Sequence, residues 1–121
     1  VHDYGMTKLH NGMNLIGGIS FEIILTFFLM IVILFVSKAR ENIAIFSGVA
    51  IGAIITIASY IGGPYTGSSM NPARSFSPTL FSGDAGLWEV QWLYWVGPIV
   101  GGIIAGVVMN YIYVNKAEKE E

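Results

Sequence analysis

Three long apolar stretches, separated by polar segments, set the pattern of this chain. They cover residues 15–36, 43–61 and 93–114. At about 1.5 Å of helical rise per residue, the first stretch gives about 33 Å, which is enough to cross the hydrocarbon core of a bilayer. We therefore expect three transmembrane helices. Residues 1–14 are polar and lack a helical period, so we interpret them as an aqueous loop in which a longer protein has been cut.

The segment between the second and third stretches follows a different pattern. Glycines and Pro64 crowd residues 62–69, so regular helix should not continue through them. Asn71 is a favourable N-cap and Pro72 suits the first turn, which predicts that a helix begins there. This helix should end at about Phe81, and its ten or so residues give roughly 15 Å, half of the hydrocarbon thickness.

Basic residues indicate how the short helix lies in the membrane. Those that follow the first and third stretches are Lys38, Arg40, Lys116 and Lys119. Lys and Arg near the ends of spans favour the cytoplasmic side. The pair after the first stretch and the pair after the third lie on the same side of the membrane only if residues 71–81 enter and leave through the same face, as a re-entrant half-helix. The loop at 38–41 and the tail at 115–121 are then cytoplasmic.

The composition indicates that lipid surrounds these helices. Hydrophobic residues make up 54% of the chain and charged residues 12%, about half of the charged share usual in soluble proteins. We therefore predict an all-α integral membrane protein, since a soluble chain of this size could not bury so much apolar surface. An aromatic cluster suits the level of the lipid headgroups. It consists of Trp88, Trp92, Tyr94 and Trp95.

The residue types present exclude several classes of function. No basic patch is large enough for nucleic acid. The absence of cysteine excludes disulfides and thiolate metal sites. His2 and His10 lie in the polar loop, far in sequence from other candidate ligands, so we expect no metal site. Because the chain has no nucleophile–base pair and no phosphate-binding loop, we expect neither an enzyme nor a cofactor.

The irregular segment before Asn71 is expected at membrane depth, where such backbone is stable only inside protein or along a wet cavity. Its carbonyl groups should therefore accept hydrogen bonds from permeating molecules, as in other backbone-lined filters. These carbonyl groups belong to Gly67, Ser68, Ser69 and Met70. The alternative is that Asn71-Pro72-Ala73 is only a good helix start. Its position between two spans favours the pore.

The head of the half-helix should be a positive site, because its first N–H groups lack partners and the helix dipole adds to them. Asn71 can offer its side-chain NH₂ to a passing oxygen, Pro72 fixes the helix start, and Ala73 is small enough for another element to press against it. Arg74 would hydrogen-bond water and repel cations, including hydronium. The alternative is that the Arg74 side chain extends to the membrane interface.

Glu22 is an ionisable residue within the first apolar stretch, so it needs a partner. Backbone N–H groups of residues 62–70 are the natural candidates. Glu22 would then be a structural strut for the irregular segment. The alternative is that it carries protons.

Two motifs occur together: Ser69-Met70-Asn71-Pro72-Ala73-Arg74-Ser75-Phe76 and, in the last stretch, Trp95-Val96-Gly97-Pro98. Together they resemble the aquaporin or major intrinsic protein family, from about Leu15 to Tyr113 in order and spacing. The resemblance implies an inverted-repeat channel with three spans and one half-helix in each half. This chain, at 15–114, would be the second half and would need a first half with the other half-helix. The family also implies homotetramers with one pore per subunit.

The resemblance also implies roles for single residues. Asn71 is the pore-centre asparagine by position, and Arg74 is the arginine of the selectivity filter, with Ser59 and Ser68 beside it. Glu22 matches the buried glutamate that braces the re-entrant loop. Ser68 replaces a cysteine that makes many members sensitive to mercury, so we expect no inhibition by mercurials at this position.

The resemblance leaves two permeants open. Water-selective members usually carry His at the position of Ser59, and glycerol-conducting members usually carry Gly there. Glycerol-conducting members also usually have Asp at the position of Ser75 and Pro at that of Tyr94, and neither is present. We therefore expect a passive plasma-membrane channel that conducts water in single file and excludes protons and ions. The alternative is a facilitator for glycerol or another small uncharged solute.

Two other classes of membrane protein fit the residues less well. A secondary transporter would need coupling carboxylates along the path, and Glu22 alone is a poor candidate. A purely structural junction-forming protein would leave Arg74 and the polar backbone of 62–70 without a purpose.

Overall fold

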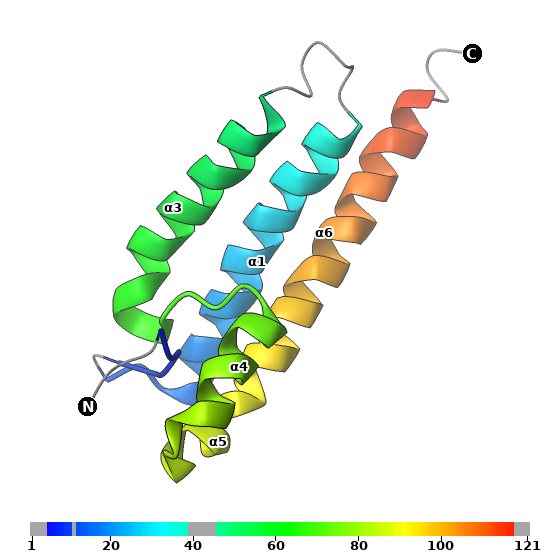
Figure 1. Cartoon of the computed structure of the whole chain (residues 1–121). Helices are drawn as coiled ribbons and strands as arrows, with labels where there is room; N and C mark the ends of the chain where they lie inside the picture. The colour runs from blue at the N-terminus through cyan, green and yellow to red at the C-terminus, as the bar shows by residue number, and fades with distance from the viewer. Residues whose placement is uncertain (1–4, 11, 39–45, 118–121) are drawn as a thin grey trace.

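The computed structural model describes residues 5–10, 12–38 and 46–117, and the structural statements below concern these residues. They form no strand and the following helices: α1 (Leu15–Ser37), α3 (Ser47–Thr66), α4 (Pro72–Ser82), α5 (Ala85–Gln91) and α6 (Leu93–Ala117). In Figure 1, α1 lies between α3 and α6, and the short helices α4 and α5 lie near the end where α6 begins. The described part of the chain is therefore all-helical.

Three helical stretches are long and apolar enough to cross a membrane. They are Leu15–Ser37, Ser47–Thr66 and Ala85–Lys116, of which the last joins α5 to α6. Large apolar side chains cover their outer surfaces, and Ile16, Phe35, Val49 and Val107 are 65–77% exposed. An apolar surface of this extent is unfavourable in water and suits lipid. The architecture is that of an integral membrane protein.

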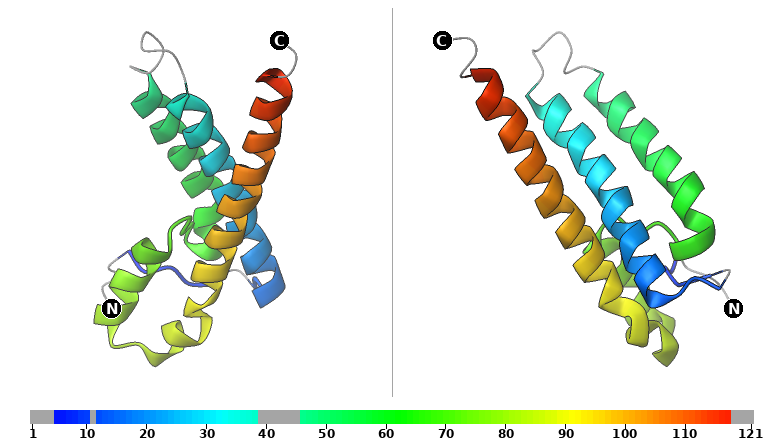
Figure 2. Two further views of the ribbon diagram at one scale, coloured as in Figure 1. Left: turned by 90° about the vertical axis from the view of Figure 1, so that its right-hand side faces the viewer. Right: turned by 180° about the vertical axis from the view of Figure 1, so that it is seen from behind.

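Helices α1 and α6 approach closely because glycines of α6 face α1. A Cβ atom added at Gly97 would lie 2.7 Å from Glu22 Cβ, and one added at Gly101 would lie 2.4 Å from the Ile23 carbonyl oxygen. A larger residue at either position would push the two helices apart. Figure 2 shows that α6 crosses α1 and diverges from it toward the C-termini of both helices.

The second apolar stretch differs from expectation, because α3 continues through the glycines to Thr66. Pro64 lies in the last turn of the helix, where its missing N–H group removes only one hydrogen bond near the helix end. The helix ends at Gly67, which has a left-handed φ of 77° and donates its N–H to the Gly63 carbonyl at 3.1 Å. The prediction that residues 62–69 do not form regular helix is therefore wrong for residues 62–66.

The half-helix α4 begins at Pro72, and Asn71 caps it. The Asn71 Oδ1 atom accepts hydrogen bonds from the N–H groups of Ala73 at 2.9 Å and Arg74 at 3.3 Å. The helix ends at Gly83, which has a left-handed φ of 69°. Helix α5, which the sequence pattern did not reveal, follows directly and is capped by the Asp84 carboxylate.

The last helix extends beyond the expected span. Helix α6 continues past Val114 to Ala117, so the expected tail at 115–121 begins in helix. Residues 39–45 and 118–121 lie outside the described residues. These residues include most of the expected cytoplasmic loop, the expected start of the second span and the end of the expected tail.

Candidate functional site

A buried carboxylate organises the turn between α3 and α4. Glu22, on α1, is fully buried. Its Oε1 atom accepts hydrogen bonds from the Thr66 hydroxyl at 2.7 Å and from the Ser69 N–H at 2.9 Å. Its Oε2 atom accepts one from the Met70 N–H at 2.8 Å. Donors from the turn thus surround the carboxylate, which offsets the cost of removing it from water.

The backbone of this turn adopts conformations that are uncommon for residues with side chains. Ser68 and Met70 have φ angles of 49° and 52°. Left-handed residues of this kind persist where their surroundings hold them, and here Glu22 holds the N–H groups of Ser69 and Met70. None of the described residues donates a hydrogen bond to the carbonyl groups of 67–70. The backbone hydrogen bonds that the turn makes with the described residues are thus those of its N–H groups.

Side-chain hydroxyls hold the turn from other directions. The Ser68 Oγ donates to the Ala58 carbonyl on α3 at 3.1 Å. The Ser69 Oγ donates to the Asn71 carbonyl at 2.9 Å and accepts a hydrogen bond from Ser75, one turn into α4. The turn is thus tied to α3 and α4 as well as to α1.

Tyr94 supports the same region from α6. Its side chain is fully buried, and its hydroxyl donates to the Thr66 carbonyl at 2.9 Å. The Tyr94 ring therefore does not face lipid, because its hydroxyl finds its partner inside the protein. The other members of the aromatic cluster, Trp88, Trp92 and Trp95, are 45–47% exposed. Nothing in the sequence pattern separates the buried tyrosine from these three tryptophans.

A groove of about 260 Å³ runs along the turn. It is lined by Leu29, Ile55, Ser59, Ser68, Ser69, Met70, Asn71 and Arg74. Its polar lining comes from the turn, the head of α4 and Ser59, whereas Leu29 of α1 and Ile55 of α3 add an apolar part. Gly67 and Ala73, which the sequence also singled out, do not line it. Gly67 instead packs against Thr7, and Ala73 is exposed.

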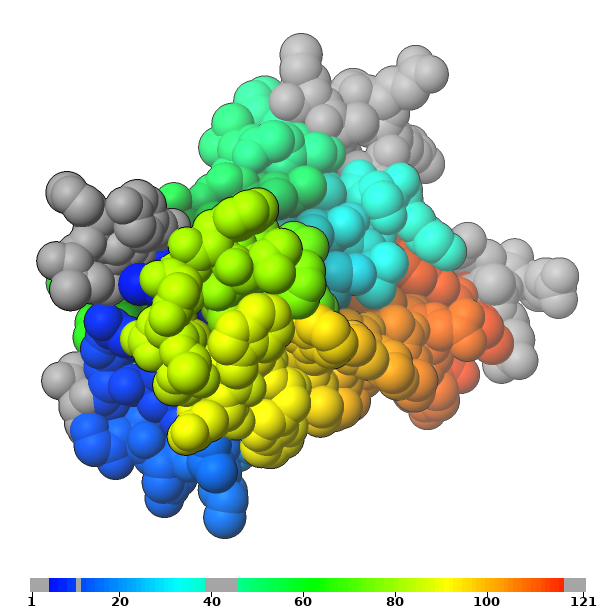
Figure 3. Space-filling view, turned by 60° about the horizontal axis from the view of Figure 1, so that its bottom comes forward, coloured from blue at the N-terminus to red at the C-terminus, as the bar shows by residue number. Residues whose placement is uncertain are grey.

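The strongest hydrogen-bond donors of the groove lie at the head of α4. The Asn71 Oδ1 atom caps the helix, which leaves the side-chain NH₂ free to donate to another molecule. The Arg74 side chain is exposed, and its Nη1 donates to the Gly5 carbonyl. Figure 3 shows the N-terminal segment, in blue, beside α4 and α5. The sequence gives no signal for Gly5, because a backbone carbonyl leaves no trace in residue type.

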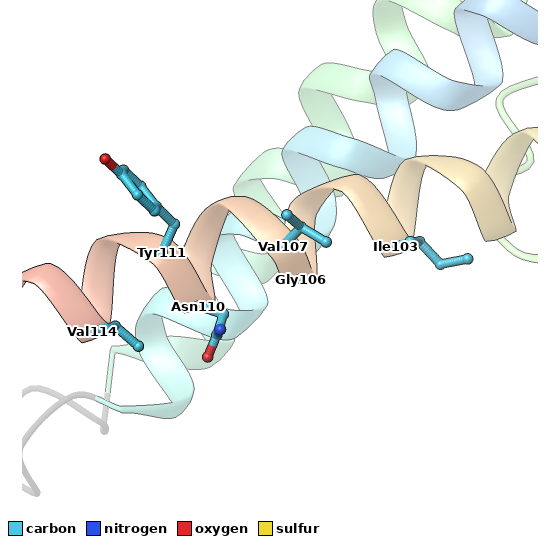
Figure 4. A pocket seen from close by; sticks show the side chains of 6 residues that line it. All are labelled: Ile103, Gly106, Val107, Asn110, Tyr111 and Val114. Atoms are coloured by element: carbon cyan, nitrogen blue, oxygen red, sulfur yellow. The ribbon is translucent and has the colours of Figure 1, made fainter.

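Other hollows lie outside this groove. One of about 380 Å³ lies on another side of the α4 head and includes Pro72 together with Thr26 of α1 and Pro98 of α6. One of about 550 Å³ lies along α6, and Figure 4 shows the side chains that line it, Asn110 and Tyr111 among them. It contains no candidate site residue, so we assign it no role.

Among the described residues, no group of three or more His, Asp or Glu side chains could hold a metal ion. The backbone N–H of His10 donates to the Tyr65 carbonyl at 2.9 Å. His2 lies outside the described residues.

Comparisons with known proteins give a consistent set of relatives. The family model described as major intrinsic protein matches residues 1–109. Aquaporin-4 of Rattus norvegicus is 38% identical over 116 residues, which are 94% of this chain and 35% of that protein. Nodulin-26 of Glycine max is 41% identical over 120 residues, 98% of this chain and 43% of that protein. The probable aquaporin TIP3-2 of Arabidopsis thaliana is 39% identical over 112 residues, 91% of this chain and 38% of that protein. The chain thus spans 35–43% of the length of these curated relatives.

Proposed function

The chain belongs to the major intrinsic protein family, and we propose that in the complete protein it forms one half of a passive channel for water or small uncharged solutes. The observation that supports this most is the turn at residues 67–70. Glu22 accepts hydrogen bonds from the N–H groups of Ser69 and Met70 in this turn. The carbonyl groups of the turn have no donor among the described residues, and the turn lies along a groove. Carbonyl groups in this arrangement can replace the hydrogen bonds that a molecule loses on leaving bulk water.

Water is the permeant that we favour, and it would pass in single file. A water molecule would donate hydrogen bonds to the carbonyl groups of 67–70 and accept one from the Asn71 NH₂. The N-terminus of α4 carries the positive end of its helix dipole, so each water oxygen would turn toward Asn71. Waters oriented in this way cannot pass a proton along the file.

Arg74 would add an electrostatic barrier to cations. Its guanidinium stays charged at any ordinary pH and lines the groove beside Asn71 and Ser68. A fixed positive charge in a narrow passage raises the energy of hydronium and metal cations but not that of neutral water. We therefore assign proton and ion exclusion to Arg74 together with the α4 dipole.

Glycerol or another small uncharged solute is the alternative permeant. Ser59 is exposed on the groove and leaves more room than a bulkier residue would. The apolar part formed by Leu29 and Ile55 would suit the carbon chain of a polyol, and the polar lining would suit its hydroxyls. This alternative differs from the water channel in solute flux, not in architecture.

The proposed channel needs partners. The groove is open on the described chain, so a first half with the other half-helix would have to close the pore. We further propose that the complete protein is a homotetramer in the plasma membrane, surrounded by lipid. The 38–41 loop and the C-terminus would face the cytoplasm.

Osmotic shrinkage of proteoliposomes that contain the complete protein tests the function. Fast shrinkage against a sugar, without re-swelling when glycerol is the osmolyte, is the expected result for a water channel. Rapid re-swelling in glycerol would favour the solute facilitator. Shrinkage and re-swelling no faster than in protein-free vesicles would contradict both.

A further inference from the structure

The buried face of the half-helix α4 carries hydroxyl groups instead of apolar side chains. The buried residues of α4 are Ser75 and Thr79, one helical turn apart, which are 0% and 1% exposed. Apolar contacts have no preferred direction, so they allow a helix to turn about its axis. Hydrogen bonds have a preferred distance and angle. Hydroxyl groups on the buried face can therefore fix the rotation of α4.

The Thr79 hydroxyl links α4 to α5. Its Oγ1 atom donates to the Ser75 carbonyl at 2.9 Å and lies 2.9 Å from Oε1 of Gln91, the last residue of α5. Gln91 is 4% exposed, and its Nε2 atom has no partner among the described residues. With the amide turned over, Nε2 would donate to the hydroxyl instead, so either orientation keeps the contact. Because α5 and α6 form one apolar helical stretch, Gln91 connects the half-helix to a membrane-spanning helix.

Further hydroxyl groups continue this contact to the head of α4. The Ser75 Oγ donates to the Ser69 Oγ in the turn, and the Ser69 Oγ donates to the Asn71 carbonyl at 2.9 Å. A line of polar groups thus follows the buried side of α4 from the end of α5 to the groove. Asn71 and Arg74 line the groove, so a rotation of α4 would displace both.

Aromatic contacts hold α4 close to the same helices. The Phe76 ring lies 5.9 Å from the ring of Trp88 on α5 and 5.9 Å from that of Trp95 on α6, between ring centroids. Burial of these rings supplies attraction between the helices, whereas the hydrogen bond between Thr79 and Gln91 supplies direction. The rotation of α4 therefore depends on the hydrogen bond.

We propose that Gln91 and Thr79 are positioning residues of the channel, whose contact fixes the rotation of α4 and thereby holds Asn71 and Arg74 along the groove. Neither Gln91 nor Thr79 lines the groove, so neither touches a permeating molecule. The proposal rests on the channel function proposed above. Without the contact α4 turns, and Asn71 no longer points to the path of the permeant.

The test removes the contact from each side with little change of side-chain size. Thr79→Val and Gln91→Met replace polar groups by apolar ones, and Thr79→Ser keeps the hydroxyl. Thr56→Val is the matched control, because the exposed Thr56 donates only within its own helix, to the Gly52 carbonyl at 2.8 Å, and does not line the groove. Each variant is made in the complete channel and reconstituted at a matched amount of folded protein. The readouts are water permeability per channel and Tm.

The proposal makes a specific forecast for the permeability. Thr79→Val and Gln91→Met should each lower water permeability per channel about five-fold, the factor that corresponds to losing one hydrogen bond. Thr79→Ser and Thr56→Val should leave it unchanged. The double variant Thr79→Val/Gln91→Met should conduct as well as either single variant, because both substitutions remove the same contact.

Two results would overturn the proposal. One is unchanged permeability per channel in Thr79→Val and Gln91→Met, even with a lower Tm, since the contact would then stabilise the protein without positioning α4. The other is a loss in the double variant equal to the product of the two single losses. If one single variant does not fold, the permeability of the other decides. A wild-type protein that conducts neither water nor glycerol would instead contradict the channel function itself.

Discussion

The Glu22 Oε2 atom accepts a hydrogen bond from the Met70 N–H at 2.8 Å, although the two residues lie 48 positions apart in the sequence. This bond joins the N-terminal half of α1, one of the membrane-spanning helices, to the turn before the half-helix. Carboxylate oxygens only accept hydrogen bonds, so both oxygens of Glu22 can serve donors of the turn at once. The conformation of the turn, and with it the direction of its carbonyl groups, depends on this one side chain.

Replacing the carboxylate by an amide should disrupt the turn. In Glu22→Gln one carboxylate oxygen becomes an NH₂ group. This group would face either the Met70 N–H or the Thr66 hydroxyl and the Ser69 N–H. The buried donor left without an acceptor should lower the free energy of unfolding by about 1–3 kcal/mol. Thermal unfolding of the purified complete protein measures this loss. Ser20→Ala, at an exposed position of the same helix, is the control. An equal Tm for Glu22→Gln and wild type would show that the hydrogen bonds of the Glu22 carboxylate do not stabilise the protein.

Two substitutions of Asn71 separate its role as a helix cap from its contact with permeants. Asn71→Ala removes the cap and should cost about 1 kcal/mol of stability. Asn71→Asp keeps an oxygen for the N–H groups of Ala73 and Arg74, so its stability should stay near that of wild type. Because it lacks the NH₂ group and adds a negative charge, it should conduct less water and admit cations. Cation flux in Asn71→Asp no higher than in wild type would contradict this.

Mercurials should affect the channel only if a thiol lines the groove. The described chain has no cysteine, so wild type should be insensitive at this site. In a complete protein without other cysteines, Ser68→Cys should make water permeability sensitive to mercury, and a thiol reductant should restore it. Ser77→Cys, at an exposed position of α4 away from the groove, is the matched control. Equal inhibition of both variants would mean that Ser68 is not at the narrow part of the path.

Tyr94 also supports the turn, and loss of its hydroxyl should measurably lower the free energy of unfolding. Tyr94→Phe deletes only the hydroxyl that donates to the buried Thr66 carbonyl and should cost about 1 kcal/mol or slightly more. Tyr111, which is 70% exposed on the same helix, offers Tyr111→Phe as the control. Denaturation midpoints of the two variants give the comparison, and a shift no larger for Tyr94→Phe than for Tyr111→Phe would remove Tyr94 from the account of the turn.

Local signals in the sequence predict the start of the half-helix. Asn71 and Pro72 are each favourable at the place they occupy, and a helix start of this kind depends on neighbouring residues alone. The need of Glu22 for a partner also follows from its residue type, because an ionisable group in an apolar span is costly without one. The hydrogen bonds to Ser69 and Met70 are of the kind expected.

Other features depend on contacts that no local pattern records. Pro64 suggested a break in the helix, but close to a helix end the missing N–H costs little, so α3 reaches Thr66. Tyr94 is buried because a carbonyl of another helix needs a donor, and residue type alone does not reveal that need. The contact of Arg74 with Gly5 spans 69 positions and involves a backbone carbonyl, which is the same in every residue.

The temperature dependence of water permeability tests the proposed pore most directly. Water that crosses lipid must first dissolve in hydrocarbon, so its rate rises steeply on warming, whereas water in a pore keeps hydrogen bonds to groups such as the carbonyls of 67–70. Proteoliposomes with the complete protein should show fast water flow with a weak temperature dependence, and Asn71→Ala should reduce the fast component. Flow as slow and as steeply dependent on temperature as in protein-free vesicles would contradict a water pore built on this turn.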